Sequence, residues 1–512
     1  MASRLARGFM TVGGWTMASR ILGFVRDIMI GAFLGSSAVA EAFLIAFSLP
    51  NMFRRFFAEG TLNVAFVPMF AKKHEGGDGA LEFARDAFAG LAFILVIFSI
   101  IAQIFMPALV YAMASGFTED NRFDLAVTYG RIAFPYILFI SLAALLSGVL
   151  NATGRFMAAA AAPVLLNVIF IAAMLIADLM GGDIGLAMTW TVPIAGIAQV
   201  VLVWIAASRA GYRLIPRIPR MTPELKRLAI IAAPAALAGG VTQINLLVGR
   251  QVASFFEGAV AWLYYADRLY QLPLGVVGIA IGIVLLPELS RNLRAGDTVA
   301  SRDALSRAGE MSLALTIPAA VALMVIPIPL IEVLFQRGAF TLDDTKWTAL
   351  ATAIYGAGLP AFVLQKVLSS VYFARENTRA PFHFALVGMV VNAGVAIGLS
   401  YHLGFIAAAI GTTLAGWTIT SLTWIGAARM GEETRFDARF WSRLWRIVAA
   451  SAIMGAALVA ATFVMAPLFA IAGLKIAALA VLVLGGIAIY GLAGHMLGAF
   501  HMAEIKSAFR RG

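Results

Sequence analysis

Long apolar runs are the feature that most constrains this chain. Segments of about 20 or more residues with few charges recur along its length, and about 20 apolar helical residues cross a hydrocarbon core about 30 Å thick. Lipid offers the backbone no hydrogen-bond partner, so such segments must be α-helices. Of the 512 residues only 13% are charged, about half the fraction of a soluble globular protein. The sequence therefore predicts an all-α polytopic membrane protein.

The apolar runs predict fourteen transmembrane helices. They are expected at residues 9–34, 41–70, 86–111, 127–150, 158–179, 184–207, 227–254, 259–287, 309–335, 347–373, 382–400, 404–428, 444–468 and 474–497. The loops between them alternate: one set is rich in Lys and Arg, above all around Arg209 to Arg227, and the other holds few, such as Arg122. Because positive residues keep loops on the cytoplasmic side, both termini are predicted to be cytoplasmic.

The remaining bulk properties exclude several classes. The net charge of +11 does not indicate nucleic acid, because the basic residues are scattered in short loops between apolar segments. No cysteine is present, which excludes disulfides and cysteine-bound metals. The basic N-terminus is followed by no clear small-residue cleavage site, so we predict a retained first helix and no removed signal peptide.

A weak internal repeat lies beneath the hydropathy. Five pairs of residues recur at offsets between 222 and 225: Arg26 and Arg250, Pro50 and Pro273, Pro107 and Pro329, Pro135 and Pro360, Asn167 and Asn392. Each unit holds six helices, an even number, so the units have the same orientation and enclose a cavity about an axis along the membrane normal. The predicted parts are an N-terminal lobe (1–220), a C-terminal lobe (221–435), and helices 13 and 14 with a cytoplasmic tail (436–512).

Ionisable residues within the predicted helices are the candidate functional residues, because charges inside a membrane are costly and usually face a wet cavity. They are Arg20, Arg26, Asp27, Glu41, Arg54, Arg55, Glu59, Asp267, Arg268 and Lys366. Six are positive and four negative, so they do not pair off. Arginine's planar fork binds phosphate oxygens bidentately. The implied ligand is a phosphate or diphosphate.

Structural explanations for these charges stay open beside the functional one. The pairs that could serve only the fold are Arg26 with Asp27, Asp267 with Arg268, and Arg55 with Glu59, the last spaced for a salt bridge along one helix. Adjacent helical residues diverge by about 100°, so Arg54 and Arg55 cannot both face one point. Arg131 and Arg250 lie near helix ends, where their side chains can reach the membrane surface.

Four stretches carry a family resemblance: ASRILGFVRD (18–27), LPNMFRRFFAEG (49–60), YYADRLYQLP (264–273) and VLQKVLSSVYFARENTRAP (363–381). At these residues the sequence resembles the MurJ (MviN) family of lipid II flippases, in the MOP exporter superfamily, and the resemblance extends over essentially the whole chain. It implies fourteen helices in two six-helix lobes (helices 1–6 and 7–12) around a central cavity. It also implies that helices 13 and 14 form a groove for the isoprenoid tail. The resemblance carries the family's cavity function over to Arg20, Arg26, Asp27, Glu41, Arg54, Arg55, Asp267, Arg268 and Lys366.

Two departures from the family pattern bear on the site. Gln271 stands in the cavity motif where the family often has an acid. The sodium site proposed for some members needs carboxylates on helices 7, 11 and 12, where this chain offers Gln243, Asn245 and Asn392. We therefore predict no metal and no cofactor, and transport driven by the membrane potential.

The resemblance and the cationic surplus together predict a flippase and not an enzyme. It would move the undecaprenyl-diphosphate-linked peptidoglycan precursor, lipid II, from the inner to the outer leaflet of the bacterial plasma (inner) membrane by alternating access, for cell-wall synthesis. Its expected partners are lipid II and membrane lipids, with no nucleic acid, and it is expected to act as a monomer.

Three alternatives differ in what the cavity should contain. A MOP transporter of cationic drugs should have an acidic cavity, whereas one for another polyprenyl-linked glycan should have a basic one. An enzyme acting on polyprenyl phosphates should have clustered carboxylates and a metal site. A receptor or scaffold would have little use for a cationic cavity.

Overall fold

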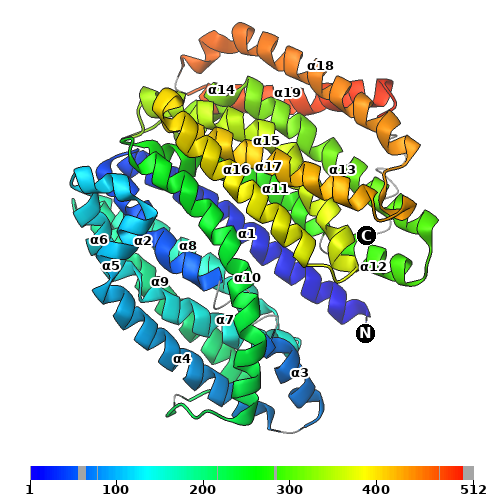
Figure 1. The fold of residues 1–512 in the computed structure, drawn as a ribbon. Helices are drawn as coiled ribbons and strands as arrows, with labels where there is room; N and C mark the ends of the chain where they lie inside the picture. The colour runs from blue at the N-terminus through cyan, green and yellow to red at the C-terminus, as the bar shows by residue number, and fades with distance from the viewer. Residues whose placement is uncertain are drawn as a thin grey trace. The chain divides into compact units, whose positions relative to one another are not determined.

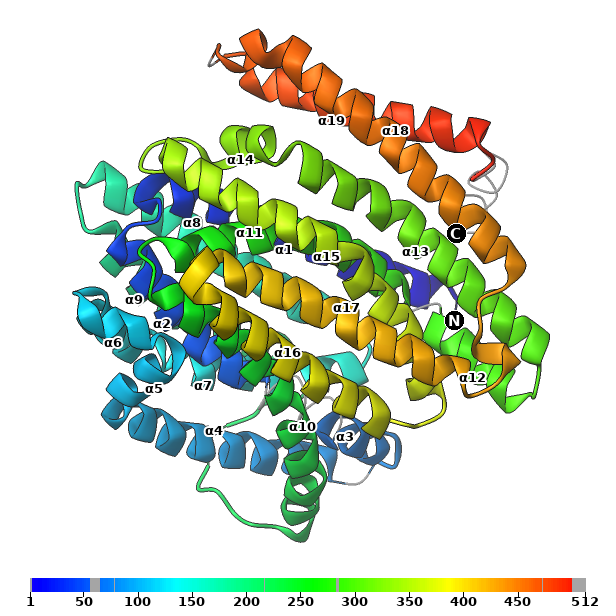
Figure 2. The ribbon, with the colours of Figure 1, turned by 45° about the horizontal axis from the view of Figure 1, so that its top comes forward.

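The computed structural model describes residues 2–55, 65–77, 79–215, 217–281, 285–471 and 473–499, and these residues form helices and no strand (Figures 1 and 2). The helices are α1 (Ala2–Leu34), α2 (Ala38–Arg54), α3 (Val67–Glu75), α4 (Ala80–Ile104), α5 (Met106–Met113), η2 (Ser115–Glu119), α6 (Arg122–Ala133), α7 (Tyr136–Ala152), α8 (Met157–Leu179), α9 (Ile184–Arg209), α10 (Pro223–Ser254), α11 (Ala259–Ala280), α12 (Leu286–Arg294), α13 (Thr298–Val325), α14 (Pro327–Phe335), α15 (Leu342–Ala374), α16 (Arg379–Leu403), α17 (Ile406–Ala428), η4 (Glu432–Thr434), α18 (Ala438–Phe469) and α19 (Lys475–Met496).

Several predicted single helices are interrupted. The segment expected at 86–111 is α4 followed by α5, with a break at Phe105, and the segment expected at 309–335 is α13 followed by α14, with a break at Ile326. A proline follows each break within three residues. Proline lacks an N–H and its ring clashes with the preceding turn, so a helix bends or ends there. The two interruptions fall at corresponding places in the predicted repeat.

Ten helical stretches among the described residues are long and apolar enough to cross a membrane. The other predicted spans correspond to α1, α2, α10 and α11. In α2 only 17 residues are described as helix before Arg55, and α1 and α11 carry charged residues near their middle, which lowers their mean hydropathy. The count of fourteen spans stays a prediction.

By its contacts the chain divides into two compact units. The first comprises Met1–Ala261 with Gly338–Phe340, and the second comprises Trp262–Arg337 with Thr341–Gly512. Helix α10 packs with α4, α5 and η2 of the first unit, although the repeat makes it the first helix of the second lobe. Helices α18 and α19 pack on each other, and α18 packs on α13 in the second unit (Figure 2). The lobe boundary at residue 220 describes the repeat and stays a prediction.

The loop before α6 and the loop before α15 occupy equivalent places in the predicted repeat, and each contacts the end of a helix of the first unit. The backbone N–H of Gly116, before α6, donates to the Ser254 hydroxyl at the end of α10 at 3.0 Å. The backbone N–H of Ala339 donates to the Ala32 carbonyl near the end of α1 at 2.7 Å. Gly338 has φ +58° and a Cβ there would meet the Ala32 carbonyl oxygen, so the close approach requires glycine. The two loops follow Pro107 and Pro329, one of the pairs that define the predicted repeat.

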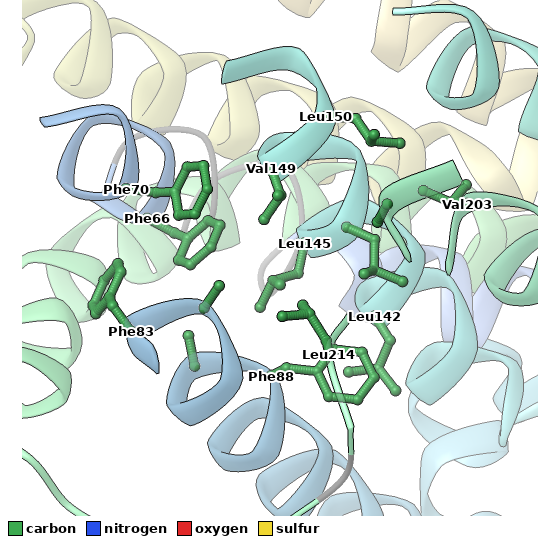
Figure 3. Packing of buried hydrophobic residues seen from close by; sticks show 14 of the residues in the cluster. Phe66, Phe70, Phe83, Phe88, Leu142, Leu145, Val149, Leu150, Val203 and Leu214 are labelled. Carbon is green, nitrogen blue, oxygen red and sulfur yellow. The ribbon is translucent and has the colours of Figure 1, made fainter. Parts of the chain in front are cut away.

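An apolar cluster fixes the end of the first unit where α9 leads into α10. Figure 3 shows Phe66, Phe70 and Phe83 facing Leu145 and Val149 of α7. The ring of Phe66, just before α3, stacks on Phe70 of α3 and on Phe83 of α4. Leu214, from the segment after α9, is fully buried in the same cluster. Close packing of this kind fixes α3, α4, α7 and the following linker as one body.

Candidate substrate-binding site

The central charged pair of the first unit lies in the C-terminal half of α1. Arg26 is 7% exposed and Asp27 is 2% exposed. The Nε and Nη2 atoms of Arg26 donate to Asp27 Oδ1 at 3.1 and 2.8 Å. The pair therefore forms between adjacent residues of one helix. A buried guanidinium carries a large desolvation penalty, which this carboxylate offsets.

Asn167 of α8 holds the other side of the Arg26 guanidinium. Arg26 Nη1 donates to Asn167 Oδ1 at 3.1 Å. The Nδ2 atom of Asn167 donates to the backbone carbonyls of Ser19 and Pro163 at 3.0 and 3.3 Å. These bonds fix the amide so that its oxygen faces Arg26, and they join α8 to α1. Sequence reasoning named Asn167 only as part of the repeat. Its signal as a site residue was a lone amide in the middle of an apolar helix.

Aromatic rings enclose the same guanidinium. Arg26 Cζ lies 5.8 Å from the ring centre of Phe47 in α2 and 5.6 Å from that of Phe170 in α8. The two rings meet edge to face with centres 5.7 Å apart. Such rings favour a cation over their faces and exclude water from it. The positive charge is thus desolvated, so an anion reaching it would be bound more strongly than in water.

Arg54 at the end of α2 converges on the same region. The buried phenol of Tyr136 in α7 lies within electrostatic reach of both Arg54 and Arg26. Tyr136 donates from its hydroxyl to Gln199 Oε1 of α9 at 3.2 Å. Arg54 is half-buried, whereas Arg55 is exposed. Their different exposure follows the divergence expected of adjacent helical residues.

The other candidates of this unit differ in how far they are described. Arg20 lies in α1 and is half-buried. Glu59 lies outside the described residues, and so does the expected Arg55–Glu59 salt bridge.

Glu41, near the start of α2, is fully buried in a second ionic cluster. Its Oε2 accepts from Arg122 Nη1 at 2.8 Å, and its Oε1 accepts from the backbone N–H of Val260 at 2.8 Å. Both carboxylate oxygens are therefore engaged by protein groups. Arg122 is buried at the start of α6, with Cζ 4.4 Å from the ring centre of Phe117.

The burial of Arg122 corrects one sequence interpretation. Its position between two apolar runs indicated a loop charge, yet it is the counter-ion of Glu41. The signal that could have found it is Glu41 itself, because a buried carboxylate at a helix start requires a positive partner. A second carboxylate, Asp120, also accepts from Arg122 Nη2, at 2.6 Å. The side-chain hydrogen bond from Arg122 holds the pKa of Asp120 below its ordinary value.

The described parts of α1 and α2 contain more arginines than acids. From Arg20 onward in α1, and in α2 with its cap Arg55, there are four arginines and two acids, Asp27 and Glu41. Glu41 binds Arg122 from another helix, and Asp27 binds its neighbour Arg26.

The candidates of the second unit lie on α11 and α15. Gln271 Nε2 donates to Asp267 Oδ2 one turn away. An acid at position 271 would repel Asp267, because the two residues are one helical turn apart. The amide of Gln271 instead gives the Asp267 carboxylate a hydrogen-bond donor. Arg268 Cζ lies 4.4 Å from the ring centre of Tyr264, and Lys366 of α15 is exposed.

Metal ligation has no support from the described side chains. They include no group of three or more His, Cys, Asp or Glu residues that could hold an ion. Asn392 is buried in α16 against Gly411. The side chains of Gln243 and Asn245 lie outside the described part of the chain, so sodium independence stays a prediction.

Comparisons with known proteins agree on one family. The family described as Lipid II flippase MurJ matches residues 30–483. A probable lipid II flippase MurJ of Rhizobium meliloti (strain 1021) is 44% identical over 518 residues, covering 99% of this chain and 97% of the relative.

Solved structures show the same fold. A lipid II flippase MurJ in an inward closed conformation aligns with a TM-score of 0.79 at 24% identity, covering 95% of this chain and 98% of that one. An inward-facing multidrug resistance transporter of the MATE family, in the MOP superfamily, aligns with a TM-score of 0.68 at 16% identity, covering 82% of this chain and 97% of that one. At these identities the likeness concerns the fold.

Proposed function

The chain belongs to the MurJ family of lipid II flippases, and from this premise we propose that it carries the diphosphate-linked head of lipid II from the inner to the outer leaflet of the plasma membrane. The family consists of transporters, so no covalent step is involved. The lobes would rock between inward-open and outward-open states while the isoprenoid tail stays in lipid.

The buried guanidinium of Arg26, with Arg54 within electrostatic reach of the same Tyr136 phenol, is the observation that carries this proposal. Two guanidinium groups in one region suit a ligand with about two negative charges, and the bidentate geometry of arginine suits phosphate oxygens. A cationic drug would be repelled by the same charges. Another polyprenyl-diphosphate glycan would be attracted, so the sugar and peptide must be identified by experiment.

Asp27 and Asn167 suit a reversible role for Arg26. Without substrate they hold the guanidinium in one orientation by three hydrogen bonds. A diphosphate oxygen can bind the same guanidinium beside the neutral Asn167 oxygen, and as a charged acceptor it is the stronger partner. Asp27 remains to compete with the phosphate, and that competition allows release.

The proposed orientation has both termini in the cytoplasm, and the absence of cysteine allows a direct test. Single cysteines are expected to react from outside at Ser37, Gly182 and His402. Single cysteines are expected to react only after permeabilisation at Gly76, Ser208 and Gly431. Outside reaction at Ser208 would overturn the proposed topology.

The proposed driving force is the membrane potential. One charge crossing the full field gains about 2.3 kcal/mol per 100 mV, so an unneutralised diphosphate with about two charges gains on the order of 4–5 kcal/mol moving outward. The emptied cationic site is then drawn back toward the negative side. In liposomes clamped with potassium and valinomycin, flipping is expected to follow the potential without sodium. Flipping that follows only a sodium gradient at zero potential contradicts this coupling.

Two further parts of the proposal concern the tail and the assembly. Helices α18 and α19 expose large apolar side chains, among them Phe463, Val464 and Leu484, which suits contact with an isoprenoid chain. The protein is proposed to act as a monomer, with lipid II and membrane lipids as its partners.

The lipid that co-purifies with the protein tests the proposal most simply. Mass spectrometry of extracts from the wild-type protein is expected to find the undecaprenyl-diphosphate disaccharide-peptide. Recovery of a different polyprenyl-diphosphate glycan would change the substrate, and recovery of none above the level of an unrelated membrane protein would overturn the assignment.

A further inference from the structure

The linker between α9 and α10, residues 210–222, combines two features that a water-exposed loop rarely has. Its large apolar side chains are open: Ile215 is 50% exposed, Ile218 is 84% exposed and Met221 is 75% exposed. Exposed Arg213 and Arg220 lie among them in the sequence. Lys226 and Arg227, in the first turns of α10, extend the exposed basic surface.

Two residues of this linker, Leu214 and Arg217, attach it to the first unit. Leu214 is buried in the apolar cluster of Figure 3, and its carbonyl accepts from Trp204 Nε1 at 2.8 Å. Arg217 pairs with Asp86 and donates to the Glu82 carbonyl. Leu214 and Arg217 face the protein, whereas the side chains of Ile215, Ile218 and Met221 remain open.

The corresponding linker of the second unit, residues 429–437 between α17 and α18, has the opposite character. It carries three acids and two arginines, whereas residues 210–222 carry three arginines and no acid. Its carboxylates are bridged: Glu433 pairs with Arg375 at 2.5 Å and Glu432 with Arg435 at 2.5 Å. Its one large aromatic residue, Phe436, is buried. The repeat thus places at equivalent positions one linker whose acids are paired with arginines and one that has no acid of its own and two exposed arginines, Arg213 and Arg220.

From this contrast we infer that the α9–α10 linker is an interfacial anchor that binds anionic phospholipids of the leaflet at this end of the helices. Ile215, Ile218 and Met221 enter the boundary between headgroups and acyl chains, and the neighbouring basic residues contact lipid phosphates. Apolar residues interleaved with arginine are the pattern that binds membrane surfaces, where apolar burial and attraction to anionic lipid act together.

The position of the linker selects lipid over a protein partner as the occupant. It directly follows α9, a helix long and apolar enough to span a membrane, so the linker begins at the membrane surface. At that depth an exposed isoleucine meets headgroups before it meets a soluble protein. The inference goes beyond lipid II transport, since its ligand is bulk anionic lipid and its residues lie outside the proposed substrate site.

A single fluorescent label tests the anchor. The chain has no cysteine, so an Ile218→Cys variant of the full-length protein can be labelled at one site with bimane and reconstituted into vesicles. The probes are phosphatidylcholine vesicles with and without phosphatidylglycerol. With phosphatidylglycerol the emission is expected to shift to shorter wavelength, and aqueous iodide is expected to quench it less.

Charge variants separate the electrostatic part of the binding. Each basic residue near an anionic surface contributes about fivefold to partitioning. Adding Arg213→Gln and Arg220→Gln to the labelled variant is therefore expected to weaken the phosphatidylglycerol response about 25-fold, and high salt is expected to weaken it as well. The matched control is Val299→Cys, which is 78% exposed in the first turn of α13 and has both acids and arginines nearby in sequence. Its response is expected to be the same in both lipids.

The inference fails if the label at residue 218 is equally open to iodide in both vesicles, or if the charge variants leave its response unchanged. Protection that appears only when cytosolic protein is added would also overturn it, in favour of a protein partner. None of these readouts uses lipid II, so a failure here is distinct from a failure of the proposed transport.

Discussion

The first unit contains two buried ionic clusters built from the same residue types, and they differ in the groups that bind the charge. At the start of α2, Glu41 has both oxygens engaged, one by Arg122 and one by a backbone N–H. In the C-terminal half of α1, Arg26 donates to one carboxylate and to one neutral amide.

This difference separates a structural ion pair from a binding site. A carboxylate whose two oxygens are both bound by protein groups is not available to a ligand. Removal of its charge takes a counter-ion away from a buried guanidinium. A guanidinium that donates to a neutral amide can gain a stronger, charged acceptor when an anion binds. The predictions below should therefore divide: changes around Arg26 act on lipid II, and changes around Glu41 act on folding.

The largest expected effect is on lipid II binding when the α1 pair is neutralised together. The double variant Arg26→Gln with Asp27→Asn removes both charges, so neither residue is left as a buried charge without the other. Charge-assisted hydrogen bonds contribute about 1.5–3 kcal/mol each, so their loss is expected to lower the affinity for lipid II by about tenfold to a hundredfold. Native mass spectrometry of a lipid II titration measures it. Unchanged affinity would remove Arg26 from the site.

The next effect is a loss of stability in Glu41→Gln. Breaking a buried pair costs about 3–5 kcal/mol, and Asp120 retains part of the contact with Arg122, so the lower end is expected. Thermal unfolding in detergent should show a clear fall in Tm, while lipid II affinity of the folded protein stays near wild type. The variant Glu41→Gln with Arg122→Gln should regain part of the stability. A folded Glu41→Gln that no longer binds lipid II would make Glu41 a substrate residue.

A smaller effect on affinity is expected from Asn167→Ala. The guanidinium of Arg26 keeps its charge and its bond to Asp27 but loses one fixed partner, a loss of about 1 kcal/mol or roughly fivefold in binding. Asn392→Ala in the second unit is the matched control, since it removes the corresponding residue of the repeat without touching α1. Equal losses in both variants would indicate a general packing defect.

The smallest effect is a pH dependence at Asp120. Arg122 lowers the pKa of this carboxyl in the folded state, so its contribution to stability is fully present above its unfolded value of about 3.9 and is lost as the pH falls through the folded value. The difference in Tm between wild type and Asp120→Asn should therefore shrink as the pH falls from 6 toward 3. The change is small because the Asp120 side chain is 39% exposed. A difference that grows in acid would contradict this account.

The sequence predicted the helices well because burial in lipid requires long apolar runs, and it predicted the charged candidates because those charges interrupt the runs. It could not place the breaks at Phe105 and Ile326, since α2 and α11 also contain prolines and yet continue through them. Whether a helix breaks at proline depends on neighbours that can satisfy the freed carbonyl.

The candidate site was predicted in composition but not in pairing. The charged motifs indicated Arg26 and Asp27. They did not indicate that Asn167, on a helix distant in sequence, also binds the Arg26 guanidinium. Arg122 was hidden for a different reason, because a charge between apolar runs indicates topology as readily as a buried counter-ion. Partners brought together by tertiary packing leave no local pattern.

Transport by Arg26 and Asp27 can be tested directly by the flipping rate of fluorescent lipid II in proteoliposomes with an imposed potential. The rate per folded molecule is compared among the wild type, the Arg26→Gln/Asp27→Asn variant and Glu41→Gln. We expect near wild-type flipping for Glu41→Gln and a loss of at least about tenfold for the α1 variant. Flipping that survives neutralisation of the α1 pair, or that is lost equally in both variants, would contradict it.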